Sequence, residues 1–199
     1  MPNTTDNFDI PFLDGTELVR DYPQFSEDLA EAVDAGLVAA GKLVAVKSAL
    51  FTGIQDSSVA GGGNVAVSGL SITHTVADPA NRLIISAFFG AAASDREQGN
   101  LGLAVHDGTG LIAIGDAAGD RLRITAGGRV AGQGNSQVVT MPSVTFVHTP
   151  GAGSKTYTVR AINLRGDTHT LFINRTQPDF DIIQLPRAVS SLVIQEVAV

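Results

Sequence analysis

Two hydrophobic periodicities divide the chain near residue 42. Before that point, Phe25, Leu29, Val33 and Leu37 recur every four residues, which is the spacing of one apolar stripe on an α-helix. Beyond it, apolar and polar residues alternate, and this pattern places successive side chains on opposite faces of β-strands. The pattern therefore predicts a short amphipathic helix over residues 24–41 and a β domain over residues 42–199.

The alternating segments are short and numerous. Turn signals separate them, for example Asp107-Gly108, Gly127-Gly128 and Pro150-Gly151. Many short strands at this spacing are typical of an antiparallel β-sandwich or jelly roll, so the predicted fold is mainly β. We expect strands at 43–46, 65–72, 83–89, 101–105, 112–114, 144–148, 157–161, 171–173 and 193–199. The last of these should be a central strand, because a terminal strand is normally tied into a sheet.

The predicted helix has small residues beside its stripe, and these permit neighbouring helices to approach closely. A helix of this length is marginal in water by itself. It must pack either on copies of itself or on its own sandwich, and we favour self-association. The candidate residues for trimerisation are Phe25, Leu29, Val33, Gly36 and Leu37.

Residues 1–23 form a segment of a different kind. Pro11 fixes its own backbone and biases Ile10 towards extended conformations, and Asp14-Gly15 is a turn signal. An extended apolar arm without a nearby partner strand docks on a neighbouring subunit or folds back on its own domain. The candidate attachment residues are Phe8, Ile10, Pro11, Phe12, Leu13, Tyr22 and Pro23.

The composition of the chain limits the kinds of partner that we expect. The chain has 199 residues, of which 44% are hydrophobic and 17% charged, and this low charge content indicates a surface that is either rich in hydroxyl groups or partly covered by partners. Its net charge is −7 and it has no long basic run, so we expect no nucleic-acid partner.

We also expect no signal peptide and no membrane insertion, since no apolar run approaches the roughly 20 residues of a membrane helix.

The residues that could act in catalysis or bind a metal are expected to have ordinary structural roles. The chain has no cysteine, and its four histidines, His74, His106, His148 and His169, have no metal-binding spacing. His74 and His148 are expected to be core or edge residues; the alternative is that they face their copies across a symmetry axis. No nucleophile elbow or phosphate cradle is present. We therefore expect no catalytic residue, no metal and no cofactor.

Charged residues in the predicted turns and loops are also expected to have ordinary surface roles. Arg121, Arg123 and Arg129 are expected to be solvated rather than to form an anion site. A carboxylate pair at Asp179 and Asp181 is expected to belong to a polar loop rather than to a hydrolase cleft. The tripeptide at 165–167, Arg-Gly-Asp, is expected to be an ordinary turn rather than an adhesion motif.

Two segments carry a resemblance to known proteins. Residues 10–23, with the pattern I-P-x-x-D-G-x-x-x-V-R-D-Y-P before the helix, resemble the N-terminal arm of minor tail and tail-fibre-like proteins of bacteriophages of actinobacteria and related hosts. Residues 172–176, Phe-Ile-Asn-Arg-Thr, and residues 185–197 resemble the end of a β-sandwich domain in phage virion proteins. Phe172 and Leu192 stand where that pattern has Tyr and Thr.

This resemblance implies a structural, non-enzymatic virion protein with a trimeric jelly roll similar to the tumour-necrosis-factor and complement type. The arm is then expected to bind other virion proteins of the tail or capsid. The loops at 94–100 and 127–135 are candidates to contact a host surface glycan or protein. Two rivals stay open, namely a capsid decoration or head-spike protein and a polysaccharide-degrading tail enzyme.

Overall fold

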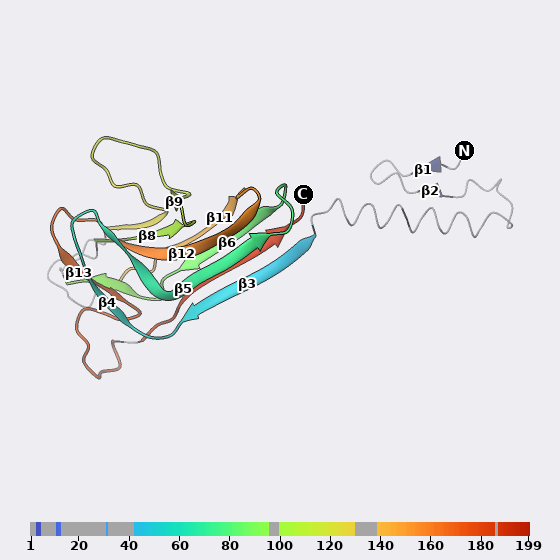
Figure 1. The fold of residues 1–199 in the computed structure, drawn as a ribbon. Helices are drawn as coiled ribbons and strands as arrows, with labels where there is room; N and C mark the ends of the chain where they lie inside the picture. Colours follow the sequence, from blue (N-terminus) through green and yellow to red (C-terminus); the bar gives the residue numbers. More distant parts are fainter. Residues whose placement is uncertain are drawn as a thin grey trace.

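A computed structural model describes residues 3–4, 11–12, 31, 42–95, 100–129, 139–185 and 187–199. Near the N-terminus, β1 (Asn3–Thr4) pairs antiparallel with β2 (Pro11–Phe12). Glu31, the one described residue of the predicted helix, is helical. From residue 42 onward the described chain is built of antiparallel strands, as the alternating pattern predicts (Figure 1).

A four-stranded sheet and a five-stranded sheet enclose the core. The first runs in the order β11-β6-β14-β3, and the second in the order β10-β8-β12-β5, with β9 paired to the end of β8 beyond β10. The first sheet contains β3 (Leu43–Phe51), β6 (Arg82–Phe88), β11 (Ser143–His148) and β14 (Ser190–Val197). The second contains β5 (Asn64–Val76), β8 (Asn100–His106), β9 (Leu111–Ile112), β10 (Ala126–Arg129) and β12 (Gly153–Asn163).

A third, smaller sheet lies at one end of the sandwich. Its order is β4-β13-β7, with β4 (Gln55–Val59), β7 (Ala92–Ser94) and β13 (His169–Ile173). The start of β3 and the C-terminus lie together at the opposite end (Figure 1). We call the end near Leu43 and Val199 the proximal end, and the end with β4 and β13 the distal end.

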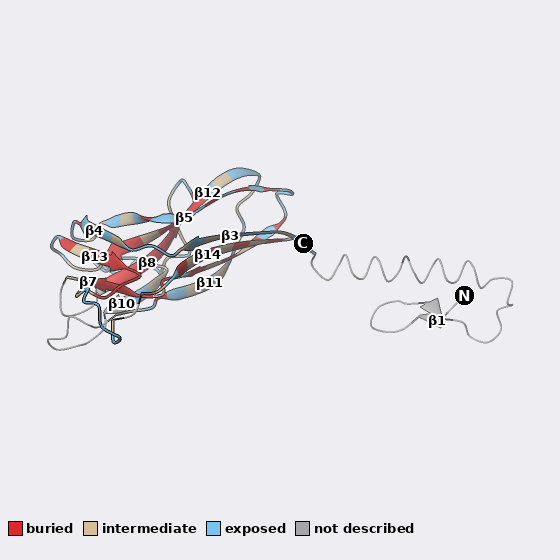
Figure 2. Ribbon diagram, turned by 90° about the horizontal axis from the view of Figure 1, so that it is seen from below, coloured by how far each residue is buried: buried red, intermediate tan, exposed pale blue. Residues whose placement is uncertain are grey.

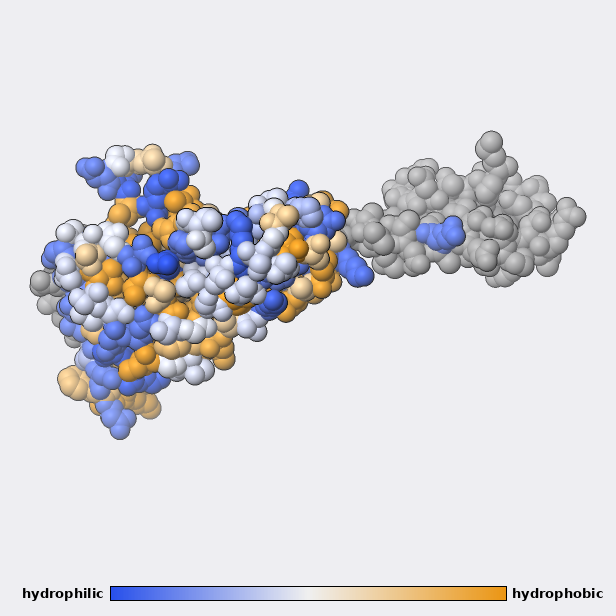
Figure 3. Space-filling model, viewed as in Figure 1, coloured by the Kyte–Doolittle hydropathy of each residue, from blue (hydrophilic) through white to orange (hydrophobic). Residues whose placement is uncertain are grey.

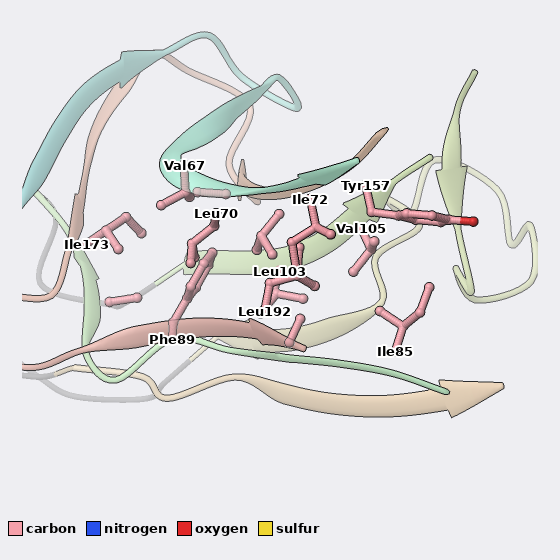
Figure 4. Close-up of a cluster of buried hydrophobic side chains, with 14 of the residues drawn as sticks. Val67, Leu70, Ile72, Ile85, Phe89, Leu103, Val105, Tyr157, Ile173 and Leu192 are labelled. Carbon is pink, nitrogen blue, oxygen red and sulfur yellow. The ribbon is translucent and has the colours of Figure 1, made fainter. Parts of the chain in front are cut away.

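The core fills the space between the two large sheets. Strands of both sheets bury every second residue, for example Leu192 and Ile194 of β14 and Leu70 and Ile72 of β5, and Figure 2 marks the buried residues along the strands in red. Figure 4 shows these aliphatic side chains stacked between the layers, with Phe89 among them. Burial of such side chains is worth about 1.5–3 kcal/mol each and drives the pairing of the sheets.

Most predicted strands are confirmed, and β14 is central because it lies between β6 and β3. The β8–β9 hairpin at Asp107-Gly108 is also confirmed. The expected turn at Gly127-Gly128 is wrong, because both residues belong to β10 and pair with β8. Gly127 has φ +112°, and a Cβ there would lie 2.7 Å from the Leu101 carbonyl oxygen, so glycine is needed for close pairing rather than for a turn.

Three strands carry no alternation that predicts them. The β4 sequence, Gln-Asp-Ser-Ser-Val, is mostly polar, and β7 is buried on both faces and only three residues long. The short β10 contains two glycines. In the other direction, the expected strand at 112–114 ends at Ile112.

Asn174 joins the ends of three strands. It has φ +65°, an unusual conformation for a residue other than glycine. Its Nδ2 donates to the carbonyl oxygens of Phe51 (2.7 Å) and Gly53 (2.8 Å), and its Oδ1 accepts from Ser190 Oγ (2.6 Å). The amide therefore ties the end of β3 and the start of β14 to the residue that follows β13.

Replacement of Asn174 tests this tie. Asn174→Gly keeps the backbone conformation but loses three buried hydrogen bonds, and should lower the free energy of unfolding by about 2–4 kcal/mol. Asn174→Ala should cost about 1 kcal/mol more, because alanine is strained at positive φ. Urea denaturation would measure both values. An alanine variant as stable as the glycine variant would contradict the backbone part of this account.

Candidate functional site

The predicted attachment and trimerisation residues fall mainly outside the described part of the chain. Pro11 and Phe12 lie in β2. The remaining ones, Phe8, Ile10, Leu13, Tyr22, Pro23, Phe25, Leu29, Val33, Gly36 and Leu37, lie outside the described residues, so their roles stay predictions. The described domain offers a different candidate, the outer face of the first sheet.

The register of the first sheet places its outward side chains in rows across the strands. One row contains Val46, Gln195, Ile84 and Val147, taken from β3 to β11. Paired residues point to the same side of a sheet, and their neighbours in β14 are the buried core residues of the opposite face. The outward residues are Leu43, Val46, Ser48, Leu50, Arg82, Ile84, Ser86, Phe88, Ser143, Thr145, Val147, Ser191, Val193, Gln195 and Val197.

This outer face combines large apolar residues, which the single chain leaves open, with polar ones, and Ser86 and Thr145 form a hydroxyl pair on it at 2.9 Å. Leu50, Val147 and Val46 are 65%, 61% and 53% exposed. Among the outward residues of these four strands, Arg82 carries the only charge. Figure 3 shows apolar residues gathered near the start of β3. Several large exposed apolar residues on one face often mark an interaction site.

The outer face of the second sheet is polar by contrast. Ser71 and Thr158 form a hydroxyl pair at 3.1 Å, and Thr73 and Thr156 form another at 2.9 Å across β5 and β12. Arg160 donates to Asn64 Oδ1 at 2.8 Å on the same strands. The two sheets thus share one core but differ outward, so the apolar character is specific to the first sheet.

The sequence did contain a signal for this face. The β3 segment begins Leu-Val-Ala-Val and β14 contains Leu-Val-Ile, so both strands are apolar at consecutive positions. Near-continuous apolar strands are typical of sheets covered on both sides. Alternation alone identified the inner face and missed the outer one.

A buried carboxylate lies between the sheets at the proximal end. Glu196 is 1% exposed; its Oε2 is 2.8 Å from His74 Nε2, and its Oε1 accepts from the Ala77 amide (2.8 Å) and Asn81 Nδ2 (2.7 Å). Burial raises the pKa of this carboxyl, but the hydrogen bonds from Asn81, Ala77 and His74 together outweigh burial and hold the pKa below its usual range. The expectation that His74 is a core residue is confirmed, and its Nε2 is paired within the same chain, although its buried Nδ1 has no hydrogen-bond partner.

Glu196 should make stability depend on pH. A carboxyl whose pKa is lower in the folded state than its unfolded value of about 4.3 stabilises the fold at neutral pH, and this contribution is lost as the pH falls through the folded-state pKa. Glu196→Gln should therefore unfold more easily than the original chain at pH 7, by about 3 kcal/mol.

The difference between Glu196→Gln and the original chain should shrink between about pH 5 and pH 3. Urea titrations at several pH values would measure it, with Asp116→Asn in an exposed loop as the control. A difference that is constant over this pH range would contradict the lowered pKa of Glu196 in the folded state.

Asp107, Lys155, Tyr157 and His148 form a second polar group, at the edge of the core. Lys155 Nζ donates to Asp107 Oδ2 at 2.6 Å, and the His148 ring meets the Tyr157 ring edge-on at 5.9 Å. Burial, assisted by the Asp107 carboxylate, raises the pKa of Tyr157 to about 12. Burial, assisted by Lys155, lowers the pKa of His148. Both rings therefore stay neutral at physiological pH and act as packing residues.

The remaining candidates have structural partners. His169 Nδ1 lies 2.8 Å from Asp95 Oδ1 and its Nε2 lies 2.8 Å from Asp167 Oδ1. The aspartate of the Arg-Gly-Asp turn is thus held against its own chain. Asp179 pairs with Arg187 at 2.7 Å in an irregular loop, as expected for a polar connection.

Comparisons with known proteins do not assign this chain to a family. No protein-family model matches the sequence, and no curated protein matches it significantly. Within the described ranges, no group of three or more His, Cys, Asp or Glu is placed to hold a metal ion. The described residues also include no helix with the length and apolar character to cross a membrane.

Proposed function

We propose that this chain is a structural, non-enzymatic component of a bacteriophage virion: a trimeric protein of the tail-fibre or receptor-binding type, anchored by residues 1–23 and displaying its sandwich outward. The resemblance of residues 10–23, 172–176 and 185–197 to phage virion proteins supports the location. The apolar outer face of the first sheet supports the assembly, and it is the observation that carries the proposal.

A jelly-roll topology of the tumour-necrosis-factor type belongs to this proposal. The strands alternate between the two large sheets along the chain: β3 is in the first, β5 in the second, β6 in the first, and β8 and β10 in the second. The path then runs to the first sheet with β11, to the second with β12 and to the first with β14. Such repeated crossing between two sheets is the connectivity expected of a jelly roll.

Assembly through the first sheet would remove the exposed apolar residues of its outer face from water. Copies that pack these faces around one axis would bury Val46, Leu50 and Val147, which a single chain leaves in water. The predicted helix at 24–41 directly precedes β3 in the sequence. Association of the first sheets would therefore gather the helices as well, so that both interfaces cooperate.

A charge placed in the outer face should dissociate the assembly. Val46→Glu would bury a carboxylate in the proposed interface, at a cost of several kcal/mol per copy, but it would be solvated in a single chain. Light scattering should give three times 20.6 kDa for the original chain and about 20.6 kDa for the variant. Thr73→Glu, on the polar face of the second sheet, is the matched control and should remain trimeric. A single-chain mass for the original protein would refute the trimer.

Removal of residues 1–23 separates anchoring from assembly. The shortened chain should keep the trimer mass but should no longer be incorporated into particles when it replaces the full chain during phage growth. Cryo-electron microscopy of particles carrying the full chain would then place it. Density on the tail supports this proposal, whereas density on the capsid shell supports the decoration or head-spike alternative. Full incorporation of the shortened chain would contradict an anchoring role for the arm.

A further inference from the structure

A pocket of about 500 Å³ opens at the distal end of the sandwich. Three segments that are far apart in the sequence line it: the β4–β5 turn, the β12–β13 turn and the loop between β9 and β10. That loop projects from the upper left of the molecule in Figure 1, away from the proximal end where Leu43 and Val199 lie. The volume of the pocket lies within the range of small-molecule sites.

Close backbone approaches build the walls of this pocket. The Gly62 amide donates to the Arg165 carbonyl oxygen at 2.9 Å, and a Cβ on Gly61 would lie 2.3 Å from the Gly166 carbonyl. The two turns therefore pack together as only glycine permits. Leu122 from the loop reaches over Gly62, where a Cβ would lie 3.4 Å from its Cδ2.

The floor of the pocket is aliphatic. Ile124 and Leu164 lie over Gly102 of β8, since a Cβ at that glycine would be 3.0 Å from Ile124 Cγ2 and 3.3 Å from Leu164 Cδ2. Gly102 is buried although it points to the outer side of the second sheet. The pocket therefore has a dry base under a polar rim.

The rim carries two guanidinium groups and one carboxylate. Arg121 and Asp120 are exposed, and Arg165 is half-buried, with its Nε 3.3 Å from Asp167 Oδ1. Asp167 offsets the charge of Arg165, so the exposed Arg121 is the guanidinium group that remains to attract an anion. Guanidinium groups bind carboxylates and phosphates through paired hydrogen bonds. An anionic group is therefore the expected ligand of this rim.

We propose that the distal pocket binds an acidic unit of a polysaccharide, one that carries a carboxylate or phosphate on a sugar or polyol. Arg121 and Arg165 would hold the anion, Asp120 would accept hydrogen bonds from hydroxyl groups, and the aliphatic floor would contact C–H faces. This deepens the proposed function by naming the class of receptor. Each pocket is built from one chain, so binding does not require the trimer.

Two other classes of ligand suit the pocket less well. A nucleic acid needs an extended basic track along its backbone, and this rim has two arginines beside an aspartate. A peptide added to a sheet needs a free strand edge, whereas turns and a loop line this site. The mixture of charged, hydroxyl-binding and aliphatic groups matches a substituted sugar.

Calorimetric titration of the full chain with four probes tests the assignment. The probes are a galacturonate tetramer, a neutral galactose tetramer, a glycerol-phosphate oligomer and tetraglutamate. We expect one or both of the acidic carbohydrate-type probes to bind, and the galactose tetramer to bind at least tenfold more weakly. The uronate and phosphate arms identify which anion is recognised. Equal affinity for tetraglutamate would overturn the glycan assignment, and failure of every probe would overturn the site.

Substitution of the two pocket arginines tests whether the acidic probe binds in the pocket. Arg121→Gln and Arg165→Gln should each weaken the acidic probe about tenfold, and Lys42→Gln, which removes a positive charge from an exposed position outside the pocket, should leave the affinity unchanged. Equal losses in all three variants would reveal general charge attraction and overturn the proposal. Light scattering on the same samples keeps the two proposals apart. A single chain that binds supports the pocket without the trimer, and a trimer that binds nothing overturns the pocket alone.

Discussion

The first sheet has an apolar inner face, and its outer face carries large apolar residues that one chain leaves uncovered. Its inner face packs on the second sheet, where Leu192 and Ile194 are fully buried, while Leu50 and Val147 on its outer face are mostly exposed. Hydroxyl pairs lie on the outside of both sheets, but the large exposed apolar residues of the two sheets lie on β3, β6 and β11 of the first. Exposed apolar area on this scale favours association, and the strand order makes the same face available in every copy. This asymmetry between the sheets is the physical basis of the proposed assembly.

The second segment of phage resemblance, 172–176, has a structural explanation in the fold. Arg175 stacks over the Phe172 ring at 4.3 Å and forms two hydrogen bonds with Asp56, at 2.6 and 2.8 Å. Asn174 joins three strand ends, and Thr176 Oγ1 donates to the carbonyl oxygen of Pro178 at 2.6 Å. The motif therefore fixes the third sheet to the sandwich. This explains why such a pattern can recur at the end of a sandwich domain without any binding or catalytic role.

How far the sequence predicts this structure depends on how local each signal is. Alternation predicts the long strands, because their inner faces are apolar at every second position. It fails for β4 and β7, whose pairing with β13 depends on distant contacts rather than on their own pattern. The same limit applies to the sites. The outer face requires the register of four strands, and Arg121 and Arg165 are 44 positions apart and meet only through the fold.

The two ends of the sandwich are built for different tasks. At the proximal end, Glu196 and His74 lock the sheets together next to the strand that continues from residues 1–41. The Glu196 carboxylate accepts hydrogen bonds from three groups there, and such a junction would suit an end that transmits position from the proposed anchor. At the distal end, Arg121 projects on a loop over a glycine-built pocket, and its guanidinium is exposed. Loops that carry binding groups on a rigid scaffold can change without disturbing the core. If three copies share an axis, three such pockets face the same direction, and weak contacts with a repeating polymer would combine into firm attachment.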